Sequence, residues 1–368
     1  MKQLLLGTLI LAGTVVHAQL SVPALYDEWR RVTFDGVVTR VEWVNPRAYL
    51  FVDVRDPGGA VVNWAIEIGN PLDLEQRGWS RRTVRTGDGV SVEAVPARDT
   101  PKRARLLALW TTRPRAQVFA GNAATARPTP AAAGPTPRWP DGQIRLGPPG
   151  GRKGYWGAAS VSTMKESGSP VSVRADGLLT NVSDADRVAP LQPWAKAVYL
   201  HRQRTLLKDD PSARCLPPGG PRQFQTAHGF QFVEQRDQGR ILVLFGGGNR
   251  NWRIIYTDGR PLGQAAEAVP SYFGSSVGRW EKDTLVVESV GYNERFWMTN
   301  GGLPHTEALR LVERFSRPDL NTLRYDVTVD DPRTYTRAWR SAWTVQWVPD
   351  RDIEEFFCEE NAESTFIR

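Results

Sequence analysis

The chain has 368 residues, with 47 lysines and arginines, 40 aspartates and glutamates, and a formal net charge of +7. This length exceeds what one ordinary hydrophobic core serves, which excludes a single small domain and favours two domains. Beyond residue 18, no apolar stretch approaches the roughly 20 residues that a membrane helix needs, which excludes an integral membrane segment in the mature chain.

The first 18 residues have the pattern of a secretory signal peptide. Lys2 precedes an apolar run from Leu4 to Val16, and Val16-His17-Ala18 provides small residues before a cleavage site at Gln19. The run is short for a bilayer and no cysteine follows it, so an uncleaved anchor is the less favoured alternative. We therefore expect a mature chain that starts near Gln19 and is periplasmic or secreted.

Residues 19–115 carry five strand patterns and one helix pattern. In the second strand, Leu50, Val52 and Val54 alternate with polar or aromatic neighbours, and Gly36 interrupts the first strand where a bulge or bend is expected. The expected strands are 32–44, 48–54, 61–68, 90–95 and 105–112, with a helix over 71–78. Three strands, a helix and two strands is the order of an OB-type barrel, and a small sandwich is the alternative.

Residues 116–151 are rich in Ala, Pro, Thr and Gly, which is typical of a linker. The second domain then covers residues 152–368. A helical pattern over 193–208 precedes a succession of strand patterns, at 230–234, 240–245, 251–256, 284–290, 308–315, 322–329, 336–348 and 354–357. Many strands with short connections predict a larger antiparallel β-barrel or strongly curved sheet with a few helices.

The chain has two cysteines, Cys215 and Cys358, both beyond the signal peptide. In an oxidising compartment, such a pair predicts a disulfide, and a catalytic thiol is the alternative. The bond would close a loop of about 140 residues and stabilise the fold by about 4–5 kcal/mol in the chain-entropy model. It would tie the beginning of the second domain to its end.

Several motifs resemble those of known families. Residues 36–46 have the pattern Gly-x-Val-x-x-Val-x-Trp-x-Asn-Pro and resemble an uncharacterised family of exported bacterial proteins, a domain of unknown function. Residues 63–67 and Gly78-Trp79 fit the same family. The second domain resembles an uncharacterised β-rich module found in similar proteins, through segments 214–219, 256–261, 276–280, 283–288, 304–309 and 312–315. The resemblance implies an exported, β-rich protein from a Gram-negative-type bacterium, and no established activity.

The chain departs from the first family's pattern at its histidines. That family often begins with paired histidines, which are absent near Tyr26-Asp27, and it has His after Asn-Pro, where this chain has Arg47. No thiol or histidine spacing suits zinc, and no glycine-rich loop leads into a helix as a phosphate site requires. We therefore predict no metal and no cofactor.

Candidate chemistry in the second domain centres on histidines near strand ends. His305 follows a Gly-Gly-Leu-Pro loop and precedes a strand, a position that suits a general base or a ligand contact, and His228 lies at another strand entrance. Arg253 and Tyr256 could orient an anionic or phenolic ligand. The alternative is structural: His305 holds its loop by a backbone hydrogen bond, and the polar run after Tyr256 forms a turn.

Fourteen tryptophans suggest an aromatic interior. Trp343 and Trp347 share one face of a strand and Trp339 extends the row, while Gly278-Arg279-Trp280 resembles a short motif of lipocalin-like barrels. Aromatic faces bind flat or sugar-like ligands, and they also pack in cores, which is the alternative reading of these residues. We include Trp280 and Trp343 among the candidate ligand-binding residues.

Charge is unevenly distributed along the chain. Between Arg77 and Arg127, eleven basic residues face only three acidic ones, which predicts either a solvated surface or contact with a cell-envelope polyanion. An OB-type barrel beside a basic segment also suggests nucleic acid binding, but export argues against that partner.

These observations favour a periplasmic or secreted protein that binds a small apolar or aromatic ligand in a Trp-rich barrel. The first alternative is an acid–base enzyme of lyase, isomerase or hydrolase type with His305 as the base. The second alternative is a non-catalytic module that interacts with the cell envelope.

Overall fold

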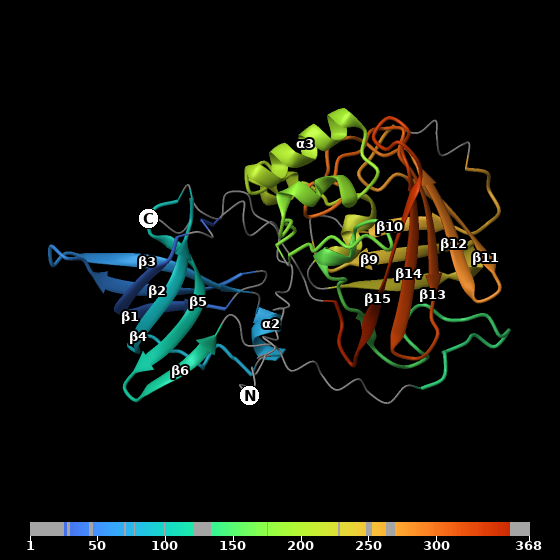
Figure 1. The fold of residues 1–368 in the computed structure, drawn as a ribbon. Helices are drawn as coiled ribbons and strands as arrows, with labels where there is room; N and C mark the ends of the chain where they lie inside the picture. Colours follow the sequence, from blue (N-terminus) through green and yellow to red (C-terminus); the bar gives the residue numbers. More distant parts are fainter. Residues whose placement is uncertain are drawn as a thin grey trace, which may run out of the picture.

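The computed structural model describes residues 26–27, 30–43, 47–69, 71–76, 78–98, 100–120, 134–174, 176–226, 229–247, 252–262 and 269–353. The strands form two sheets, one between residues 32 and 120 and the other between residues 154 and 349 (Figure 1). The first contains a closed five-stranded ring and the second is a closed nine-stranded barrel. The prediction of a mainly β protein with an OB-like domain and a larger barrel is therefore confirmed. No helix among the described residues combines the length and the apolar character needed to cross a membrane.

The small barrel has the strand order expected of an OB-type fold. Its elements are β1 (Val32–Glu42), β2 (Ala48–Arg55), β3 (Val61–Gly69), α2 (Pro71–Gln76), β4 (Gly89–Pro96), β5 (Arg103–Thr112) and β6 (Arg115–Ala120). The ring runs β1-β2-β3-β5-β4 and returns to β1, with β3 and β5 parallel. Strand β6 pairs with β5 and extends the sheet beyond the ring. Inward side chains such as Val52, Ile66 and Val90 are fully buried.

Gly36 lies next to the point where β1 changes from pairing with β4 to pairing with β2. The first half of β1 pairs with β4 and the second half with β2, and the change occurs at Val37, which pairs with both. A Cβ atom at Gly36 would lie 2.5 Å from the main-chain oxygen of Asp53 and 2.5 Å from a methyl group of Val52. Only glycine permits this approach without displacing β2, and the bend predicted at this residue lies beside an irregularity in the β1–β2 register.

The two ends of the predicted linker pack on the barrels. Residues 115–120 form β6, whereas Ile144 and Leu146 are fully buried in the core of the large barrel. Arg138 pairs with Asp283 through both guanidinium nitrogens, at 2.9 and 2.7 Å. We call residues 134–147 the strap. Residues 121–133 lie outside the described residues.

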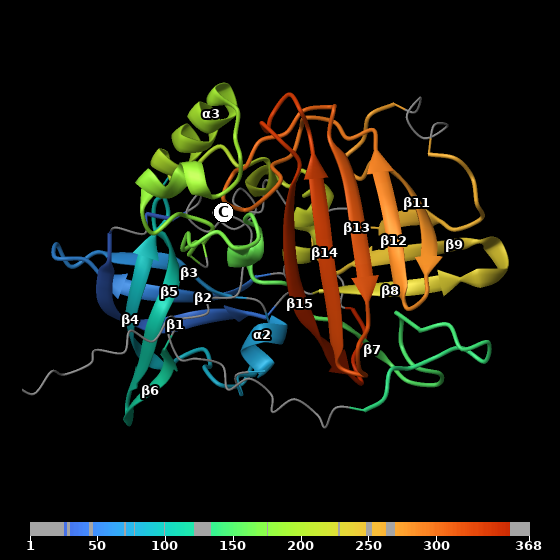
Figure 2. The same ribbon diagram turned by 45° about the vertical axis from the view of Figure 1, so that its right-hand side comes forward.

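The large barrel is assembled from nine strands. They are β7 (Gly154–Trp156), β8 (Phe230–Gln235), β9 (Arg240–Phe245), β10 (Trp252–Tyr256), β11 (Ser275–Glu281), β12 (Thr284–Val290), β13 (Arg310–Ser316), β14 (Thr322–Asp330) and β15 (Trp339–Pro349). Neighbouring strands are antiparallel except β10 and β11, which are parallel, and β12 to β15 lie side by side (Figure 2). The sequence did not reveal β7, which is only three residues long, or β11, whose Gly278 interrupts its alternation. The predicted strand at 354–357 lies outside the described residues.

Both ends of the large barrel are covered. At one end, the strap packs against the β13–β14 turn, where Arg317 donates to the main-chain oxygens of Arg145 and Gly147. At the other end lie the connections 291–309 and 331–338, helix α3 (Pro193–Arg204) and the 3-10 helix η4 (Gly220–Gln225). We call this second end the loop end. There, buried Arg222 pairs with Asp210 and donates to Asn300 at 2.5 Å, which fastens η4 to the 291–309 connection.

Replacing Gly36 with alanine should destabilise the small barrel by about 1–3 kcal/mol, because the new methyl group would overlap the β2 backbone. Thermal unfolding followed by circular dichroism, with hydrogen exchange of the β1 and β2 peptides, would measure the effect. Gly58→Ala is the matched control, since its nearest contact would be a side-chain oxygen at 3.3 Å. Equal stability of the two variants would contradict the role assigned to Gly36.

Candidate functional site

The middle of the large barrel is filled by aromatic rings. Phe224 enters from η4 and lies 4.8 Å from Phe230, 5.5 Å from Phe315 and 4.9 Å from Tyr325, measured between ring centroids. Tyr325 in turn lies 4.5 Å from Trp343. All five side chains are buried and belong to one continuous core. For this part of the interior, the described residues favour core packing over an open cavity.

Arg253 is the centre of a buried polar network in the same interior. Its guanidinium binds both carboxylate oxygens of Glu313 and donates to Ser276 at 2.9 Å and Ser289 at 2.7 Å. The Tyr325 hydroxyl donates to Glu313 at 2.9 Å. These five residues come from β10, β13, β11, β12 and β14, so five neighbouring strands each contribute one side chain.

This network stabilises the charged form of Arg253 in the dry interior. Burial alone would lower the pKa of Arg253, but the adjacent Glu313 carboxylate raises that pKa above its usual value. Burial and the same carboxylate raise the pKa of Tyr325 well above 10, so the hydroxyl remains a donor. Arg253 therefore has its polar atoms engaged by protein groups, and it is placed to stabilise the barrel and not to bind a ligand from solvent.

His305 lies at the loop end, as its position before β13 suggested, but its ring is buried. Its Nε2 lies 3.1 Å from the main-chain oxygen of Phe296 and its Nδ1 lies 3.2 Å from that of Thr306. The ring also stacks on Phe296 at a centroid distance of 4.1 Å. Burial lowers the pKa of His305 below its usual value, against the opposing effects of these carbonyls and of Asp331. The geometry matches the structural alternative, a histidine that holds its loop.

The other candidate residues do not converge on one point. Tyr256 follows the buried Ile255 on β10. The Arg260 guanidinium carbon lies 3.6 Å from the centroid of the Tyr256 ring, which fits the predicted turn. Trp343 lies in the aromatic interior, and Trp280 packs partly buried against the same core. His228 and Cys358 lie outside the described residues, so the disulfide from Cys215 stays a prediction.

The loop end contains buried polar atoms that have no hydrogen-bond partner in the described part of the chain. Among them are the side-chain oxygens of Gln223 and Gln225 and the indole nitrogen of Trp339. All three side chains are at most 2% exposed. Such orphaned groups are rare in folded proteins and cost about 1–3 kcal/mol each unless water or a ligand satisfies them.

Gln225 and β15 are linked through Thr163, which ends the 3-10 helix η1 (Val161–Thr163). The Gln225 amide donates to the Thr163 hydroxyl at 3.1 Å, and the Ser341 hydroxyl donates to the Thr163 main-chain oxygen at 3.0 Å. Ser341 and Trp339 both point inward from β15. Sequence reasoning missed the glutamines because nothing in their local pattern distinguishes them from surface residues.

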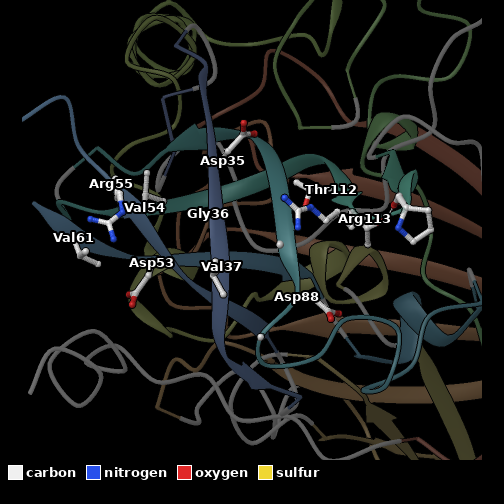
Figure 3. A pocket seen from close by; sticks show the side chains of 14 residues that line it. Asp35, Gly36, Val37, Asp53, Val54, Arg55, Val61, Asp88, Thr112 and Arg113 are labelled. Atoms are coloured by element: carbon white, nitrogen blue, oxygen red, sulfur yellow. Dashed lines mark hydrogen bonds between the residues drawn. The ribbon is translucent and has the colours of Figure 1, made fainter. Parts of the chain in front are cut away.

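A second candidate site is an open groove at one end of the small barrel, with a volume of about 950 Å³. Residues 35–37 of β1 run through its middle, residues 53–55 and Val61 form one wall, and residues 87–89 with 111–114 form the other (Figure 3). Val37 is 48% exposed and Val61 is 55% exposed, high values for aliphatic side chains on strands. Asp35, Asp53 and Asp88 supply negative charge, and Arg55 and Arg113 supply positive charge.

Comparison with known proteins gives a family match in the N-terminal part of the chain. Residues 8–105 match DUF6152, a family of unknown function. The match covers β1 to β4 and the start of β5, and it confirms the resemblance of the first domain to an uncharacterised family. Neither the curated proteins nor the solved structures provide a match.

Replacing Arg253 with methionine should lower the free energy of unfolding of the large barrel by about 3–5 kcal/mol, because Glu313 would be left buried and uncompensated. Denaturant unfolding followed by near-ultraviolet circular dichroism would measure the loss. The double variant Arg253→Met/Glu313→Leu should recover much of it. Arg324→Met, which breaks an exposed pair with Asp326, is the control and should cost less than about 1 kcal/mol. A double variant less stable than Arg253→Met would contradict this account.

The stability of the large barrel should fall as the pH drops below about 6.5, the ordinary pKa of histidine. Because folding lowers the pKa of His305, the unfolded chain binds a proton at this residue at a higher pH than the folded chain does. For this group, each pH unit below 6.5 therefore lowers the free energy of unfolding by at most about 1.4 kcal/mol. Above about pH 6.5, the contribution of His305 to the free energy of unfolding does not change with pH. His305→Gln should flatten the profile between pH 5 and 6.5, measured by denaturant unfolding, whereas a matched change at exposed His201 should not. Identical profiles for wild type and His305→Gln would refute the assignment.

Proposed function

We propose that this protein is an exported binding protein that takes a small aromatic or largely apolar ligand at the loop end of its large barrel. The observation that carries the proposal is the set of buried polar atoms there without partners, on Gln223, Gln225 and Trp339. A bound molecule with its own donors and acceptors would satisfy these atoms and offset the cost of leaving them dry.

The surroundings of these atoms support an aromatic ligand. Trp339 lies 5.4 Å from Tyr335, and Phe296 stacks on His305 at the same end. Flat ligands pack well between such rings, while a few fixed polar groups give orientation. Because Phe224 and its neighbours fill the middle of the barrel, the ligand is confined to the loop end.

Catalysis is the weaker candidate. A general base needs a nitrogen that can reach a substrate proton, but both ring nitrogens of His305 face main-chain oxygens. Arg253 is likewise committed to Glu313. Binding without chemistry therefore accounts better for both residues that the enzyme hypothesis required.

Export and contact with the cell envelope belong to the same proposal. The signal-like first 18 residues support a periplasmic or secreted location. Arg81, Arg82, Arg85, Arg113 and Arg115 are exposed on the small barrel, which supports contact between the basic segment 77–127 and an envelope polyanion. In this account the small barrel is the accessory domain.

The proposal is tested with 4-fluorobenzamide, whose amide donates to glutamine oxygens and accepts from an indole N–H. We expect saturable binding to the mature chain, measured by fluorine nuclear magnetic resonance. Trp339→Phe should weaken it about fivefold to tenfold, the effect of one lost hydrogen bond. Fluorobenzene, which lacks the amide, should bind more weakly than 4-fluorobenzamide.

The control is Trp252→Phe, because the Trp252 side chain is 52% exposed on the outside of β10. This variant should bind 4-fluorobenzamide like the wild type. Absence of saturable binding, or equal affinity of Trp339→Phe and wild type, would overturn the proposal and leave ordered water as the partner of the buried atoms.

A further inference from the structure

The wall of the small barrel is incomplete on one side of β1. β1 pairs with β4 over residues 32–37, but its pairing with β2 begins only at Val37, opposite Asp53. Beyond that point β2 pairs with β3 alone, as far as Arg55 opposite Val61. Among the described residues, 32–36 of β1 and 54–55 of β2 therefore have strand partners on one side only, and the two edges diverge.

The groove lies between these edges. It is lined by Asp35, Gly36 and Val37 of β1 and by residues 53–55 of β2, and β1 passes between its two walls in Figure 3. An edge strand directs every second N–H and C=O group away from its single neighbour, which makes it a template for another strand. The exposed valines Val37 and Val61 add an apolar surface of the kind that marks interaction sites.

Charge defines which kind of strand fits. Asp35 is exposed in the middle of the groove and makes no ion pair among the described residues, and its neighbour on the same face is Val37. Side chains at adjacent positions across a strand pair interact most favourably when they are of opposite charge or both apolar. The groove has three carboxylates and two guanidinium groups, so the charge balance also favours a basic segment.

We propose that this groove binds an extended basic peptide segment of a partner protein, which adds as a strand beside residues 32–36 of β1. A basic side chain of the segment lies opposite Asp35, and apolar side chains two positions away cover Val37 and Val61. Main-chain hydrogen bonds supply affinity, and a basic residue with apolar residues two positions away supplies selectivity. The site is independent of the ligand proposed for the large barrel.

The test uses the mature chain and the acetylated, amidated peptide Val-Thr-Lys-Thr-Val, whose valines lie two positions from the lysine, with Val-Thr-Glu-Thr-Val as the charge-reversed peptide. Isothermal titration calorimetry should show saturable binding of the first and none of the second. Hydrogen exchange should show new protection in peptides that contain residues 32–36. Asp35→Lys should weaken binding by at least about tenfold, because attraction becomes repulsion.

Glu75→Lys provides the matched control, since Glu75 is exposed on α2 and does not line the groove. It should bind like the wild type, and circular dichroism should show both variants folded. Binding without protection of residues 32–36, or unchanged by Asp35→Lys, would overturn the proposal. A wild-type dimer that Asp35→Lys dissociates in sedimentation experiments would also overturn it and assign the groove to a second copy of the chain.

Discussion

A single ion pair, Arg253 with Glu313, constrains the centre of the large barrel. Both charges are buried, and a charge in a dry interior is tolerated only when its partner and its remaining hydrogen bonds are all in place. Ser276, Ser289 and Tyr325 complete the set from three further strands. A shift of one residue in any of these strands would turn its member outward. The network therefore specifies register across β10–β14, including the parallel contact between β10 and β11.

The same constraint limits where the proposed ligand could bind. Packed rings and satisfied charges occupy the middle of the barrel, and the strap covers the β13–β14 turn at one end. Among the described residues, Gln223, Gln225 and Trp339 leave polar atoms unsatisfied at the loop end, where connections of irregular structure meet η4 and η1. In the small barrel, the groove also lies where regular pairing stops, at the end of the β1–β2 pairing at Val37. In both domains, regular pairing gives stability and its interruptions give candidate sites.

Much of the fold could be predicted from local pattern. Alternation located β2 and β12 almost to the residue. The row Trp339, Trp343 and Trp347 does face one way, into the barrel. The candidate site was harder to predict. Arg253 was predicted to orient a ligand, but it pairs with Glu313, which is 60 residues away, and no local signal connects the two.

The sequence by itself determined the β character of both domains, the order of the small barrel's strands and the aromatic content of the large barrel. These features follow from side-chain periodicity and turn residues, which depend only on residues close together in the sequence. Only the tertiary structure decided that the aromatic rings fill the barrel, that the His305 ring is buried between two main-chain oxygens, and that β1 and β2 diverge beside a groove. These features depend on which distant segments meet, and the free energy of burying rings or charges is defined only once their partners are in place.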